Sequence, residues 1–228
     1  MSVLAPLHFA DAREAAALAA FLGRLVHYDR AAAVRLRCDG GALAVFGRPP
    51  SFEVLAIRTA RLVDAAGFDV TVSAGELLDG IEESAGKAAV PGAVTGPPWT
   101  GVLPPRGGWE PVAGLPDADG MRGAVAAAVA EFRARDEALP EERRTRSERD
   151  RIGREIWSRT LGATGLPLRA VHAAQSLGFL PPASVAADVP LALFASGPWL
   201  RLRTPYGSVA LRTVPMGLQV APVAASHA

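Results

Sequence analysis

Four arginines with alternating spacing are the residues of this chain best suited to chemistry. Arg35 and Arg37 belong to the run VRLRCDGGALAV, and Arg201 and Arg203 belong to the run LRLRTPYGSVAL. A guanidinium group binds phosphate or carboxylate through paired, charge-assisted hydrogen bonds. Because side chains alternate across a strand, both arginines of each run are expected on one face. The pattern indicates a surface for phosphate, RNA or an acidic partner, or else a solvated face in an arginine-rich chain.

The two runs resemble each other and predict two β-hairpins. They are identical at five of twelve aligned positions, including the Arg-Leu-Arg core. In the first run, Asp39-Gly40-Gly41 supplies the positive-φ residues that a tight hairpin turn requires. We expect hairpins at about 34–46 and 199–213, with their arginines facing solvent. The pattern leaves open whether the two hairpins share one sheet.

Residues for catalysis or metal binding are scattered along the chain. No glycine-rich phosphate loop and no nucleophile elbow occurs in the sequence. The histidines stand far apart, outside metal-ligand spacing, and Cys38 is the only cysteine. Cys38 falls on the apolar side of its strand, which favours an inert core thiol. The sequence therefore predicts no catalytic residue, no metal site and no cofactor, and it disfavours an enzyme.

One stretch resembles the second half of a winged helix-turn-helix. It reads RTLGATGLPLRAVHAAQSLGFL and ends at Leu180. The resemblance implies a degenerate DNA-binding unit within residues 150–213, with the second hairpin as its wing. It also implies that Arg169, His172 and Gln175 contact the major groove. The alternative is a corner where two helices pack against each other.

The order of elements predicts an α+β protein with antiparallel or mixed sheets and packed helices, in two lobes that each carry an arginine-faced hairpin. Asp11 and Ser73 are each expected to cap a helix, and either Asp117 or Asp119 to cap a third; Pro140 is expected to begin one that runs to about Leu161. The expected domains are an N-terminal lobe (1–90), a Pro/Gly-rich strap (91–118), a C-terminal helical lobe (119–214) and a flexible tail (215–228).

The strap contains two tryptophans, which are unusual in free linkers. Trp99 and Trp109 predict either that the strap is pinned onto the domain surface or that it docks a partner. Both tryptophans are therefore candidate partner-binding residues alongside the hairpin arginines.

Bulk composition limits the classes of function. The 228 residues are 50% hydrophobic and carry a net charge of +1, which gives no overall attraction to nucleic acid or to an anionic membrane. No apolar run is long enough to span a membrane. Lys87 is the only lysine, and this arginine- and alanine-rich composition resembles that of uncharacterised actinobacterial proteins.

These features favour a non-catalytic, cytoplasmic binding or regulatory protein that contacts a protein partner. The alternatives are a DNA-binding protein, with nucleic acid as a less supported partner, and an enzyme with a cleft between the two lobes.

Overall fold

Strands from both halves of the chain form one continuous sheet. The computed structural model describes residues 5–63, 67–181 and 190–213. Within these residues, eight strands pair antiparallel in the order β5-β2-β3-β4-β11-β10-β9-β8. The predicted α+β class is confirmed. The strands are β2 (Ala33–Asp39), β3 (Ala42–Gly47), β4 (Leu55–Arg61), β5 (Phe68–Ser73), β8 (Glu110–Val112), β9 (Ala192–Ser196), β10 (Trp199–Thr204) and β11 (Gly207–Arg212).

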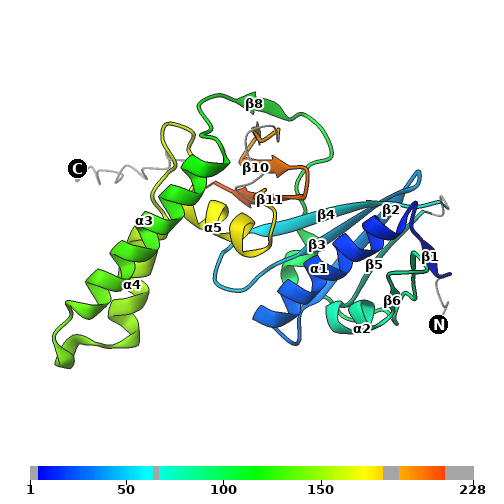
Figure 1. The fold of residues 1–228 in the computed structure, drawn as a ribbon, viewed down its shortest axis with the longest axis horizontal. Helices are drawn as coiled ribbons and strands as arrows, with labels where there is room; N and C mark the ends of the chain where they lie inside the picture. The colour runs from blue at the N-terminus through cyan, green and yellow to red at the C-terminus, as the bar shows by residue number, and fades with distance from the viewer. Residues whose placement is uncertain (1–4, 64–66, 182–189, 214–228) are drawn as a thin grey trace, which may run out of the picture.

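Helices cover one face of this sheet. In Figure 1, α1 lies along the N-terminal strands, α5 lies beside β11, and the pair α3–α4 extends away from the sheet. A small separate sheet, in the order β1-β7-β6, flanks the N-terminal half. The helices are α1 (Ala12–Tyr28), α2 (Ala74–Asp79), α3 (Ala118–Glu137), α4 (Arg146–Trp157) and α5 (Leu168–Ser176), and the short strands are β1 (Leu7–His8), β6 (Ile81–Glu82) and β7 (Lys87–Ala88).

Most helix starts follow from their capping residues. Asp11, Ser73 and Asp117 accept backbone N–H groups at the starts of α1, α2 and α3, as predicted. The prediction for α4 is wrong at both ends, because the helix begins at Arg146 and ends at Trp157. Thr145 caps it by accepting the Glu148 N–H at 3.3 Å, and only a short 3₁₀ turn follows Pro140.

The main core lies between the helices and the sheet. Leu18 and Leu22 of α1 are fully buried, as are Leu36 of β2 and Leu202 of β10. Burying each such side chain contributes roughly 1.5–3 kcal/mol. The apolar residues that alternate with the arginines therefore fix which face of each hairpin turns inward.

Both predicted hairpins are present, and they lie in the same sheet. Gly40 and Gly41 form the first turn with φ of 57° and 79°, as the sequence predicts. The returning strands, however, differ from the sequence alignment. Ala44 lies opposite Arg37, whereas Ser208 and not the aligned Ala210 lies opposite Arg203.

The strap crosses the sheet on the side away from the helices, which we call the open face. Trp99 and Trp109 are partly buried and pack against a second apolar cluster that includes Phe46, Ile57 and Trp199. Part of the strap pairs as β8 with β9 at the edge of the sheet. The division into lobes and strap stays a prediction, and the expected tail lies outside the described residues.

Candidate functional site: arginines on the open face

The register of the sheet brings the arginines of both hairpins to the open face. Residues directly opposite each other on paired strands point to the same side. Arg35 lies opposite Phe46, which in turn lies opposite Ile57. Ile57 lies opposite Ser208, which lies opposite Arg203. One row across five strands therefore joins Arg35 to Arg203, with two apolar side chains and one serine between them.

The arginines of the first hairpin share one carboxylate within the fold. Arg35 donates two hydrogen bonds to the Asp69 carboxylate, at 2.6 and 2.8 Å. Arg37 Nε lies 3.1 Å from the same carboxylate, and Arg35 also donates to the Thr100 carbonyl of the strap. The hydrogen bond from Arg35 lowers the pKa of Asp69, and the same bond raises the pKa of Arg35. This pair holds β2, β5 and the strap together.

The arginines of the second hairpin have no such partner. Among the described residues, no carboxylate forms an ion pair with Arg201 or Arg203. Arg201 donates to Ser208 Oγ at 3.2 Å and lies 5.9 Å from the ring centre of Trp109. Its buried Nε atom makes no hydrogen bond. Burial and the neighbouring Arg203 lower the pKa of Arg201.

A hollow of about 590 Å³ opens over these two arginines. We call it the Arg201 pocket. Hydroxyl groups and two guanidinium groups face it, together with an aromatic ring, which is a donor-rich set suited to an anion. The residues used below are Ile57, Thr59, Phe194, Arg201, Arg203 and Ser208.

A second hollow, of about 460 Å³, lies near the crossing of the strap and is here called the Trp99 groove. Its apolar floor includes two tryptophans, and three arginines surround it against one carboxylate. Arg169 Nε lies 3.5 Å from Glu53 Oε2 but makes no hydrogen bond. The defining residues are Arg48, Glu53, Trp99, Arg169, Trp199 and Arg212.

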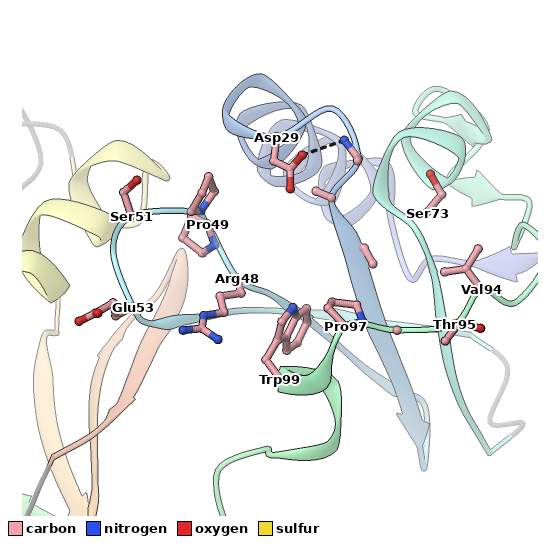
Figure 2. Close-up of a pocket in the computed structure, with 15 residues that line it drawn as sticks. Asp29, Arg48, Pro49, Ser51, Glu53, Ser73, Val94, Thr95, Pro97 and Trp99 are labelled. Carbon is pink, nitrogen blue, oxygen red and sulfur yellow. Dashed lines mark hydrogen bonds between the residues drawn. The ribbon is translucent and has the colours of Figure 1, made fainter. Parts of the chain in front are cut away.

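The turn that carries Glu53 is strained. Ser51 and Glu53 adopt φ of 69° and 54°, which is uncommon for residues other than glycine. Arg48, Glu53 and Trp99 also line a neighbouring hollow of about 640 Å³. Figure 2 shows Arg48 and Trp99 in the middle of that hollow, with Ser51 and Glu53 on one side and Ser73 and Thr95 on the other. The groove and this hollow therefore meet at Arg48 and Trp99.

The residues predicted to contact DNA lie on α5, which is largely a core helix. Ala170, Val171, Ala173 and Ala174 are buried. His172 stacks on Trp157 with ring centres 4.5 Å apart and meets Phe52 edge-on. Burial lowers the pKa of His172.

Of the three predicted DNA contacts, Gln175 is exposed and Arg169 belongs to the Trp99 groove. The DNA-contact prediction gains no support from this arrangement.

Other chemistry-bearing residues are separated. Cys38 is a free, buried cysteine, and burial raises its pKa. The described part of the chain holds no group of three or more His, Cys, Asp or Glu side chains placed to bind a metal ion. No helix in that part is long and apolar enough to cross a membrane.

Sequence patterns pointed to Trp99 and Arg169 of the Trp99 groove but not to three of its charged residues. Arg48 and Glu53 lie in the connection between β3 and β4, whereas Arg212 ends β11, and the pairing of β4 with β11 brings these two segments together. A weak signal existed in the Pro49-Pro50 break, which marks a turn next to Arg48.

Comparisons with known proteins divide the chain into two parts. Residues 3–101 match the family model described as Domain of unknown function (DUF8010), and residues 104–216 match Domain of unknown function (DUF8185). The expectation that the chain resembles an uncharacterised protein is thereby confirmed. No curated protein matches.

Two solved structures of the DNA polymerase sliding clamp from Pseudomonas aeruginosa, one of them with ligand, are similar to this chain. The first is 12% identical with a TM-score of 0.49 and covers 95% of this chain. The second is 13% identical with a TM-score of 0.42 and covers 88%. The chain spans 66% and 63% of their respective lengths. Likeness at this level carries no inference about function.

Proposed function

We propose that this chain is a non-catalytic binding protein that holds an acidic segment of a partner protein in the Trp99 groove. The observation that carries the proposal is the imbalance of charge around an apolar floor. Arg48, Arg169 and Arg212 surround the groove, and among the residues that the structure describes Glu53 is the one carboxylate that lines it. Within the described residues, Arg48 and Arg212 form no ion pair.

The floor of the groove supports a peptide with an apolar anchor. Trp199 is 9% exposed, Trp99 is partly buried, and Leu55 and Leu211 lie beside them. Aromatic and arginine side chains in a desolvated pocket are the usual origin of strong binding in protein interfaces. An acidic segment with one or two apolar side chains would match both the floor and the rim.

A protein partner fits the charge better than a nucleic acid does. Nucleic-acid affinity comes largely from many phosphate contacts, but the net charge here is only +1. The three arginines around the groove can pair with a few carboxylates of an acidic protein segment. We also propose that the protein acts in the cytoplasm and that binding of the partner has a regulatory role. Cell fractionation tests the location.

Cross-linking in the native cell tests the proposal directly. A photo-cross-linking amino acid is placed at Val102, which lines the groove and is 48% exposed. The matched control is Val63, which is 69% exposed and does not line the groove. We expect a product specific to position 102 whose cross-linked segment is acidic. Identical products at both positions, or a nuclease-sensitive product at 102, would overturn the proposal.

Binding of the identified segment then tests the role of each arginine. We expect Arg212→Gln and Arg48→Gln each to weaken binding about tenfold, which corresponds to roughly 1.4 kcal/mol. Arg106→Gln is the matched control, because Arg106 is already paired with Asp39 at 3.2 Å. Equal losses in all three variants would point to general charge attraction and would contradict the groove assignment.

A further inference from the structure

The Arg201 pocket holds positive charge that forms no ion pair with a carboxylate of the described residues. Arg201 is partly buried, its buried Nε atom has no hydrogen-bond partner, and Arg203 lies beside it. Burying a charge without a partner is unfavourable, and an arginine cannot relieve the cost by losing its proton. A bound anion would supply the charge and the hydrogen-bond acceptor that this pocket lacks.

Several hydrogen-bond donors line the pocket. Arg201 Nη2 lies 3.2 Å from Ser208 Oγ, which places that hydroxyl within reach of the same anion. Arg203 and the exposed Thr59 also line the pocket, and neither side chain has a hydrogen bond or ion pair within the described residues. A doubly charged oxyanion with several acceptor oxygens matches two guanidinium groups better than a single carboxylate does.

The size and the remaining lining indicate more than a bare ion. The volume of about 590 Å³ falls in the range of small-molecule sites, roughly 300–1,000 Å³. Phe194 lies directly opposite Arg201 on the neighbouring strand, and Ile57 lies opposite Ser208. These apolar side chains would contact an organic group attached to the anion.

We propose that the Arg201 pocket binds a small organic phosphate monoester. Its phosphoryl group is held by Arg201, Arg203 and Ser208, and its organic part lies against Phe194 and Ile57. The pocket shares no lining residue with the Trp99 groove. This site therefore stands independently of the proposed protein partner.

Calorimetric titration of the full chain with phenyl phosphate, inorganic phosphate and benzoate tests the proposal. We expect phenyl phosphate to bind with one site per chain, inorganic phosphate at least fivefold more weakly, and benzoate more weakly still. No heat from phenyl phosphate at millimolar concentration would overturn the proposal. Equal affinities for phenyl and inorganic phosphate would overturn the organic-ester assignment.

Charge-neutral variants locate the site. Arg201→Gln and Arg203→Gln are expected to lower phenyl phosphate affinity at least tenfold, and Ser208→Ala about threefold. Arg37→Gln is the matched control, since Arg37 occupies the aligned position in the first hairpin and is paired with Asp69. Unfolding midpoints confirm that each variant folds. If Arg201→Gln does not fold, Arg203→Gln is the variant that tests the site. Loss of binding in the control as well would overturn the location.

The pH dependence of binding gives a second readout. A phosphate monoester gains its second negative charge near pH 6. We expect affinity for phenyl phosphate to rise about tenfold between pH 5 and pH 7.5. Sulfate, which keeps its two charges over this range, should show no such rise. Affinity that stays constant for phenyl phosphate would contradict recognition of the dianion.

Discussion

The two hairpins share a sequence pattern but differ in what lies next to them. In the first hairpin, the neighbouring strand places Asp69 directly opposite Arg37. In the second, the neighbouring strand places Ala192 directly opposite Arg203, which aligns with Arg37. One side chain on an adjacent strand thus separates an arginine pair that shares a carboxylate from a pair that forms no ion pair within the described residues.

This difference shows why a repeated motif is a weak guide to function. Arg35 forms a bidentate ion pair with Asp69 and donates a hydrogen bond to the strap, so its role is structural. Arg201 makes one hydrogen bond to a serine and contacts Trp109. Partners supplied by other segments, and not the motif itself, decide which arginines can meet a ligand.

The largest expected effect comes from the two aligned glycines. A Cβ atom at Gly207 would lie 2.5 Å from the Phe179 ring, whereas at Gly41 its nearest contact is the Leu62 carbonyl at 3.4 Å. We expect Gly207→Ala to destabilise the fold by about 2–3 kcal/mol and Gly41→Ala by about 1 kcal/mol. Urea unfolding measures both. A larger loss for Gly41→Ala would contradict the closer packing around Gly207.

Removing Asp69 should make the first hairpin resemble the second. Asp69 is 37% exposed, so after allowance for solvent screening we expect Asp69→Asn to cost about 1 kcal/mol. The arginines lower the pKa of Asp69 in the folded state. Its stabilising contribution is therefore present above about pH 4 and is lost as pH falls through the lowered pKa.

Urea unfolding at pH 7 and at pH 2.5 measures this difference. The gap between wild type and Asp69→Asn should shrink at the lower pH. A gap that stays constant would show that the loss comes from packing and not from the ion pairs.

Adding a carboxylate should make the second hairpin resemble the first. Ala192→Asp places an acid opposite Arg203, and we expect it to stabilise the fold by about 0.5 kcal/mol. It should also abolish binding of phenyl phosphate, because the pocket would supply its own anion. Ala192→Asn is the control for size. Retained binding in the aspartate variant would indicate that the anion is held elsewhere.

The smallest effect is expected at His172, which contrasts with Arg201. Both are partly buried bases with lowered pKa values, but only histidine can become neutral near pH 7. His172 should stabilise the fold above about pH 6.5, and this contribution should fall as pH decreases toward the lowered pKa. Between pH 7 and pH 6 we expect a loss of about a few tenths of a kcal/mol.

His172→Phe keeps an aromatic ring against Trp157 and removes the titrating group. Thermal unfolding at several pH values should therefore show a shallower acid dependence in the variant than in the wild type. Equal slopes would place the responsible group elsewhere.

Much of the local structure could be predicted from the sequence. The caps at Asp11, Ser73 and Asp117 depend on residues a few positions away, and the turn at Gly40 depends on positive-φ tolerance. The predicted start of α4 at Pro140 was wrong because Thr145 caps the helix five residues later. The returning strand of the second hairpin was misaligned, since a turn at Pro205 and Tyr206 replaces the Gly-Gly turn.

The candidate sites could be predicted only in part. Arg201 and Arg203 stood out through their spacing, whereas Arg48 and Arg212 carried no periodic signal. They line one groove because β4 pairs with β11, more than 140 residues away in the chain. Pairing over such distances depends on the packing of the whole molecule, which local patterns do not encode.

By itself, the sequence determined where the hairpins form and which of their faces carries arginine, because alternation and turn residues act within a few positions. The tertiary structure decided which arginines are free. It placed Asp69 beside the first pair and Ala192 beside the second, and it brought the strap tryptophans onto the same face. The physical reason is that charge compensation depends on distance in space, and only the folded sheet sets the neighbours of each guanidinium group.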